Sequence, residues 1–311
     1  MSFGDGFLRF PDLFPGRRGG EPWGDRSLAL DIAGGPYRFS GLSAQQEEAV
    51  RRKFAGLCRA QEGGEKVVSR VFRAPRADFL DFDLKGWEYS MDMEHSPTAV
   101  RLAGLRLMAR LDWSPSLAGG LWTSEAEGDE WTSVFENFLR VLTSYRLLEE
   151  GGAVLHSAGV TDGFSAWVLF GPSGAGKTTS SRMCLERGGS VLSDDLNAVL
   201  LPREGTHLPS PPLLVRLPFT GDLGERSGGP PSYPLAAVLR LVKGSEDRLR
   251  PLSQAAALAG LVAAAPVVNK DPYRREALLG VLERLASQVP AYELVFSLNG
   301  RLWDILKSIP K

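Results

Sequence analysis

Residues 167–178 read Trp167-Val-Leu-Phe-Gly171-Pro-Ser-Gly-Ala-Gly-Lys177-Thr178. The last eight residues match the Walker A pattern, G-x-x-x-x-G-K-[ST]. An apolar, β-rich run precedes the pattern and helical spacing follows it, which is the context that this motif requires. We therefore predict a strand, a glycine-rich loop and a helix that together bind the phosphates of a nucleotide.

The glycines of this loop allow several backbone N–H groups to point at one phosphate, beside the positive end of the following helix. Lys177 can reach the β- and γ-phosphate oxygens, and the Thr178 hydroxyl can bind Mg²⁺. A glycine turn that carries a lysine by chance is the alternative, which the agreement of motif and context disfavours. The predicted nucleotide-binding residues are Gly171, Ser173, Gly174, Ala175, Gly176, Lys177, Thr178 and Thr179.

Asp194 and Asp195 follow the short β-like run Val191 to Ser193, and Asp194 stands seventeen residues after Lys177. In a strand–loop–helix–strand unit the second strand runs parallel to the first, so its end reaches the edge that carries the loop. One carboxylate could then hold Mg²⁺ while the other accepts a proton from an attacking hydroxyl. The alternative is a turn in which Asp195 caps local backbone groups.

His156 is the third candidate. Asp162-Gly163 is a signal for a two-residue hairpin turn, which would set Thr161 opposite Phe164 and His156 opposite Leu169. The histidine would then lie at the end where the second strand enters the glycine loop. A lone histidine on an apolar strand is more often a core residue, and the combined spacing of the three elements favours a functional one.

These segments resemble the HPr serine kinase/phosphorylase family and the wider set of HPr-kinase-like and ATP-dependent phosphoenolpyruvate-carboxykinase-like P-loop proteins. The matching text is Leu155-His156, Leu169 to Thr179, Arg187-Gly188-Gly189 and Val191 to Asp195. The resemblance implies an α/β fold with a P-loop kinase core of the HPr-kinase/PEP-carboxykinase type. It also implies roles: Asp194 as the base, His156 orienting it, Lys177 and Thr178 on phosphate and Mg²⁺, and Asp195 supporting the metal or the acceptor.

The rest of the chain suggests a second domain. Short β-like runs separated by Gly, Pro and Asp fill Lys66 to Thr123, after an amphipathic helix that begins at Ser43. We therefore expect a smaller N-terminal β-rich α+β domain of unknown role over residues 1–128. The P-loop nucleotide-binding domain would then cover residues 129–311.

Composition excludes several classes of protein. The 36 basic and 37 acidic residues of this 311-residue chain leave a net charge of −1, so we expect neither nucleic acid nor an anionic membrane as partner. The longest apolar run, Ala255 to Val268, is too short to span a bilayer. Two cysteines and the absence of a signal-peptide pattern suggest a cytoplasmic protein. His95 and His207 have no partners at ligand spacing, so no zinc site is expected.

Together these features predict an ATP- and Mg²⁺-dependent kinase that transfers the γ-phosphoryl group to a hydroxyl, expected to be a serine of a protein or peptide. A small-molecule kinase and a non-catalytic, ATP-gated interaction module are the alternatives. Arg216 and Arg226 are candidates for an arginine beside the acceptor. The resemblance also allows a homo-oligomer; the acceptor and the base of the nucleotide stay open.

Overall fold

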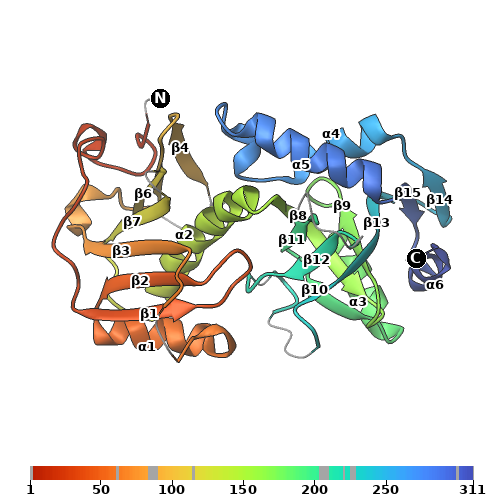
Figure 1. Ribbon diagram of the computed structural model, residues 1–311, viewed down its shortest axis with the longest axis horizontal. Helices are drawn as coiled ribbons and strands as arrows, with labels where there is room; N and C mark the ends of the chain where they lie inside the picture. Colours follow the sequence, from red (N-terminus) through yellow and green to blue (C-terminus); the bar gives the residue numbers. More distant parts are fainter. Residues whose placement is uncertain are drawn as a thin grey trace. The chain divides into compact units, whose positions relative to one another are not determined.

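The computed structural model describes residues 3–60, 63–82, 90–113, 116–202, 210–219, 221–224, 229–298 and 301–310. The chain divides into two compact units, residues 1–146 and 147–311 (Figure 1). The division falls inside a long helix, α2 (Gly128–Glu149). The boundary expected from the sequence, between residues 128 and 129, lies instead at the start of that helix.

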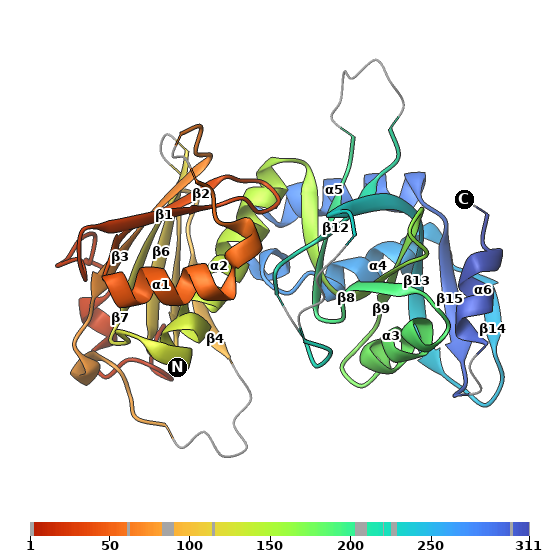
Figure 2. The ribbon, with the colours of Figure 1, turned by 90° about the horizontal axis from the view of Figure 1, so that it is seen from below.

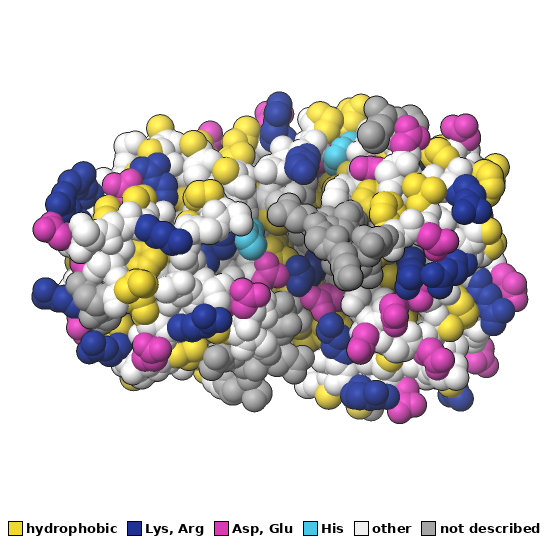
Figure 3. Space-filling view, turned by 180° about the vertical axis from the view of Figure 1, so that it is seen from behind, with side chains coloured by type: hydrophobic (Ala, Val, Ile, Leu, Met, Phe, Trp, Pro, Cys, Tyr) yellow, Lys and Arg dark blue, Asp and Glu magenta, His cyan; other side chains and the backbone are white. Residues whose placement is uncertain are grey.

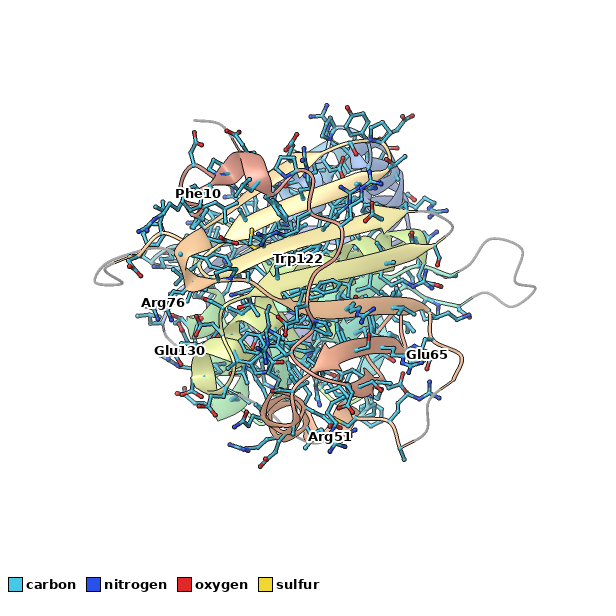
Figure 4. The ribbon with its side chains drawn as sticks, turned by 90° about the vertical axis from the view of Figure 1, so that its left-hand side faces the viewer. Phe10, Arg51, Glu65, Arg76, Trp122 and Glu130 are labelled. Atoms are coloured by element: carbon cyan, nitrogen blue, oxygen red, sulfur yellow. The ribbon has the colours of Figure 1, made fainter. Side chains whose placement is uncertain are left out.

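The first unit is built on a mixed sheet of seven strands in the order β1-β2-β3-β7-β6-β5-β4. Its strands are β1 (Arg26–Leu30), β2 (Tyr37–Leu42), β3 (Val67–Arg73), β4 (Met91–His95), β5 (Ala99–Gly104), β6 (Leu107–Trp113) and β7 (Leu117–Thr123). The β2/β3 and β3/β7 pairs are parallel and the others antiparallel. Figure 4 looks onto this sheet, with Trp122 among its strands.

Both faces of this sheet are packed, because successive side chains of a strand point to opposite faces. On one face Phe39 contacts Phe135 of α2, with ring centroids 4.7 Å apart. On the other face Phe72 stacks on Trp122 at 5.1 Å. Phe14 belongs to the N-terminal arm, residues 3–25, which precedes β1, and its ring lies 6.0 Å from that of Trp122. The arm therefore belongs to the core of the first unit.

The first unit also contains α1 (Ala44–Lys53), which begins where the sequence predicts. Ser43 Oγ accepts the N–H of Gln46 and Gln46 Oε1 accepts the N–H of Ser43, both at 3.1 Å. This capping box satisfies two backbone donors that the helix itself leaves unpaired. Single 3₁₀ turns are found at η1 (Pro11–Leu13), η2 (Ala55–Leu57), η3 (Arg76–Asp78) and, in the second unit, η4 (Val268–Lys270).

The second unit is organised around a closed ring of strands. β8 pairs with β9 and with β11, β11 pairs with β12, β12 pairs with β13, and β13 pairs back with β9. β10, β14 and β15 extend this five-stranded barrel. The strands are β8 (Gly152–Thr161), β9 (Ala166–Phe170), β10 (Ser190–Ser193), β11 (Leu196–Leu200), β12 (Leu213–Arg216), β13 (Ser232–Lys243), β14 (Arg248–Pro251) and β15 (Ala291–Phe296).

Four helices cover the barrel: α3 (Lys177–Glu186), α4 (Gln254–Ala264), α5 (Arg275–Gln288) and α6 (Leu302–Ser308). α4 and α5 pack side by side, apart from α3 (Figures 1 and 2). α3 contacts β8, β10 and α6. Under α3 and α6 the buried side chains of Trp167, Leu169, Cys184 and Trp303 form part of one hydrophobic core.

The expected fold class is wrong. The sequence indicated an α/β protein with a P-loop kinase core and a smaller N-terminal α+β domain. The described residues instead form a β-rich chain with two sheets, one of which closes into the five-stranded barrel. Within the described part of 147–243, only β9–α3–β10 follows the strand–helix–strand order, and the other strands succeed each other directly. The strand–loop–helix–strand unit at the motif therefore does not define the fold of the whole second unit.

The predicted hairpin between β8 and β9 is present with a different register. Thr161 pairs with Ala166 rather than Phe164, because Asp162 Oδ1 accepts the N–H groups of Phe164 and Ser165 at 3.0 and 2.9 Å. The last pair of the hairpin is Ser157 with Phe170. His156 therefore lies one position beyond the pairing, level with Gly171 instead of Leu169.

Charged side chains of both signs are interspersed on the face drawn in Figure 3, as the near-zero net charge leads one to expect. No helix in the described ranges combines the length and the apolar character that crossing a membrane requires.

Candidate functional site

The glycine loop, residues 171–176, connects the end of β9 to the first turn of α3. Its backbone needs glycine at position 176, where φ is +102°. A Cβ there would also come within 2.6 Å of the Phe296 ring. α3 begins at Lys177, so its unpaired N–H groups face the loop. The strand–loop–helix segment predicted from the motif is thus present, and it can bind an anion.

Lys177 is buried inside this loop, with 7% of its surface exposed. Its Nζ donates to the carbonyl oxygens of Gly171 and Pro172, at 3.2 and 3.4 Å. Burial lowers the pKa of Lys177, and the nearby carboxylate of Asp195 partly opposes that shift. An ammonium group with so little water around it interacts strongly with any anion that enters the loop.

Asp194 and Asp195 form a two-residue bend between β10 and β11, just after a β-bulge in β10 between Val191 and Ser193. These two strands pair with successive parts of β8, and the N–H of Ser157 donates to the carbonyl of Asp195 at 3.0 Å. β8 lies between β10 and β9, so these two strands do not pair with each other. Both run antiparallel to β8, however, and therefore end at the same edge. The two aspartates, which follow β10, therefore lie at the same edge of the sheet as the glycine loop, which follows β9.

Two separate side-chain pairs surround the loop. Thr178 Oγ1 donates to Asp194 Oδ2 at 3.0 Å, and Asp194 is 5% exposed. His156 Nδ1 lies 3.1 Å from Asp195 Oδ1, and this imidazole and carboxylate are more exposed. The buried aspartate is thus paired with the hydroxyl at the start of α3, and the exposed aspartate with the histidine.

One cavity of about 680 Å³ joins these groups. Apart from Gly171 and Ala175, all the predicted nucleotide-binding residues line it, together with His156, Asp194 and Asp195. Three further residues line it that the sequence did not indicate, namely Gly221, Asp222 and Lys243. The structure therefore brings together nearly the whole predicted set.

Mg²⁺ suits this donor set better than a metal that needs a complete protein cage. The described residues contain no cluster of three or more histidine, cysteine or carboxylate ligands. Mg²⁺ is commonly held by one or two carboxylates together with substrate phosphates. The Thr178 hydroxyl and the Asp194 carboxylate, already 3.0 Å apart, are donors of that kind.

Residues 123–310, more than half of the chain, match a protein family described as SynChlorMet cassette protein ScmC. The chain belongs to the ScmC family. No curated protein matches it. The family description names a cassette and no activity, so the chemistry of this ScmC protein has to be argued from its site.

Gly221 was missed because its role depends on packing across the barrel. A Cβ at this position would lie 2.6 Å from Asp194 Oδ1 and 3.1 Å from Asp195 Cβ. No signal in the sequence marked this close approach. Of the two candidate arginines, Arg216 does not line the cavity, and Arg226 lies outside the described residues, as do Thr220 and His207.

Asn197 is a buried residue that holds the Asp194–Asp195 bend in place. Its Nδ2 donates to the Ser157 carbonyl at 2.7 Å and to the Ser193 carbonyl at 3.2 Å, and the side chain is 0% exposed. Ser193 Oγ in turn accepts the N–H of Asp195 at 3.1 Å and donates to the Phe219 carbonyl at 3.0 Å. These bonds connect the strand carrying His156 to the strand carrying the aspartates.

Replacing Asn197→Leu should therefore lower the free energy of unfolding by about 1–3 kcal/mol, because buried carbonyl groups lose their donor. Urea denaturation of the full chain measures this loss. Ser157→Ala is the matched control, since it removes only the longest of the Asn197 contacts, the 3.3 Å bond to Ser157 Oγ. Equal stability of Asn197→Leu and wild type would show that the amide does not hold the bend.

Proposed function

We propose that this protein is an ATP- and Mg²⁺-dependent kinase that transfers the γ-phosphoryl group to a hydroxyl, carried by a serine of a protein or peptide. The observation that carries the proposal is the presence of two separate pairs, Thr178–Asp194 and His156–Asp195, beside a buried lysine in one cavity. Phosphoryl transfer needs groups that hold phosphate and metal, and a separate group that accepts a proton.

The nucleotide would bind through the glycine loop and the start of α3. Backbone N–H groups of this segment would donate to phosphate oxygens, and the Lys177 ammonium would contact them inside the loop. Thr178 and Asp194 would hold Mg²⁺ next to the phosphates, where the metal neutralises their negative charge. The 3.0 Å separation of these two side chains supports this arrangement.

Asp195 is the better candidate for the base, with His156 as its positioning residue. As the acceptor oxygen forms its bond to the γ-phosphorus, the bond from that phosphorus to the β,γ-bridging oxygen breaks. The hydroxyl proton passes to the Asp195 carboxylate, and ADP leaves with the electron pair. This assignment exchanges the roles that the resemblance to HPr kinases implies for Asp194 and Asp195. It is supported by the contact of Asp194 with Thr178 and of Asp195 with His156.

The acceptor is expected to come from the same cassette, because the family description places ScmC proteins in one. The HPr-kinase-like spacing of His156, the loop and the aspartates supports a protein or peptide serine over a small molecule. We also expect the reaction to occur in the reducing cytoplasm, since the two cysteines are free and Cys184 is buried.

The test is phosphoryl transfer by the purified chain, with γ-labelled ATP, Mg²⁺ and each other protein of the cassette as acceptor. The expected result is label on a serine of one acceptor, with one ADP formed per phosphate transferred and no transfer in EDTA. Label on a small hydroxyl compound alone would identify a small-molecule kinase. ATP-dependent partner binding without any transfer would contradict the kinase assignment and leave the ATP-gated module.

A further inference from the structure

Lys243 stands at the C-terminal end of β13, close to the glycine loop. β13 and β9 are parallel neighbours, and their pairing ends at Arg240 with Phe170. From that point β13 continues for three residues, while the other chain turns into the loop. Pairing of Lys243 with Phe296 of β15 keeps this extension in the sheet. The end of β13 therefore places Lys243 beside the glycine loop.

The side chain of Lys243 faces the loop. Its Cε lies 3.6 Å from the position that a Cβ on Gly176 would occupy, and the residue lines the same cavity as Lys177, Thr178 and Asp195. Among the described residues its ammonium group forms neither an ion pair nor a hydrogen bond. Lys243 differs in this respect from Lys177, whose ammonium is already held by two loop carbonyls.

The negative charge of the cavity and of a bound nucleotide favours a second cation near the phosphates. Three carboxylates line it, those of Asp194, Asp195 and Asp222, against the two ammonium groups of Lys177 and Lys243. A nucleoside triphosphate adds about four negative charges, of which a bound Mg²⁺ balances two. An exposed ammonium on a flexible stem can move to a phosphate oxygen at little cost, because it loses no existing partner.

We propose that Lys243 is a second phosphate-binding lysine, which contacts the phosphate chain of the bound nucleotide. This inference rests on the proposed function, because it assumes that the glycine loop binds a nucleoside triphosphate. In this proposal the Lys243 ammonium contacts phosphate oxygens, and it contacts neither the nucleobase nor the acceptor.

Nucleotide binding by calorimetry tests the assignment with the full-length chain. The variants are Lys243→Ala, Lys243→Arg and the control Lys270→Ala, an exposed lysine of the same unit that does not line the cavity. The ligands are MgATP, MgADP and AMP. Loss of a charge-assisted contact should weaken MgATP binding about tenfold in Lys243→Ala. MgADP should lose less and AMP least, while Lys243→Arg restores most of the affinity and Lys270→Ala behaves like wild type.

Two failures of this experiment are distinguishable. If wild type binds none of the nucleotides, the proposed function fails. If wild type binds MgATP and Lys243→Ala binds it equally well, only the assignment of Lys243 is overturned. An equal loss for MgATP and AMP in Lys243→Ala would likewise exclude contact with the outer phosphates.

Discussion

Asp195→Asn should reduce phosphoryl transfer by about 10²–10⁴-fold, the range typical for the loss of a general base, while MgATP still binds. The amide keeps the size of the carboxylate and can still contact His156, whose Nδ1 lies 3.1 Å from Asp195 Oδ1. It cannot accept the proton of the acceptor hydroxyl. The measurement is the single-turnover rate with saturating MgATP, together with the dissociation constant for MgATP.

Asp194→Asn is the matched comparison because it changes the neighbouring carboxylate in the same way. Asp194 is paired with Thr178, so this variant should need a much higher Mg²⁺ concentration for half-maximal transfer. Asp195→Asn should leave the Mg²⁺ requirement nearly unchanged. The opposite result, with an altered Mg²⁺ requirement only in Asp195→Asn, would support the roles that the resemblance implies, with Asp194 as the base and Asp195 at the metal.

Lys177→Met should weaken MgATP binding by about 10²-fold or more, because a charged donor inside the loop is lost. The variant also removes the donor of the Gly171 and Pro172 carbonyls, so its melting temperature has to be measured alongside its affinity. Calorimetry and thermal denaturation on the same samples separate the two effects.

The lowered pKa of Lys177 also predicts proton uptake when a nucleotide binds. Burial places the pKa of the free protein below the ordinary value of 10.5, and a bound phosphate raises it again. Between these two values the complex holds more protons than the free protein, so affinity falls as pH rises through that window. Binding enthalpies in buffers of different ionisation heat report the uptake. Lys177→Met should abolish it, and uptake that persists in this variant must come from another group.

Most of the candidate site could be predicted from the sequence because it depends on short-range pattern. The motif from Gly171 to Thr178 requires a loop followed by a helix, whatever the rest of the chain does. Likewise, Val191 to Ser193 was recognisable as a strand that ends directly before Asp194. The capping residue Ser43 located the start of α1 in the same way. Because such signals depend on only a few neighbouring residues, they predict local structure correctly even when the fold class is wrong.

The fold class could not be obtained in the same way, because strand pairing connects distant residues. β12 and β14, four residues each, were not recognised as strands. β12 pairs with both β11 and β13 and so closes the barrel. A prediction that misses β12 therefore misses the barrel. The strand–loop–helix–strand unit expected at the motif is present as β9–α3–β10, but β8 lies between the two strands, so they do not pair in a parallel sheet.

The sequence by itself determined which groups take part: a glycine loop, a lysine, a histidine and two aspartates at set intervals. Tertiary structure alone decided how they pair, because Thr178 meets Asp194 and His156 meets Asp195 only once a bulge and an Asx turn set the register across β8. It also decided that Lys243 joins them. That residue follows the loop lysine by 66 positions, and only the parallel pairing of β13 with β9 places it beside the loop.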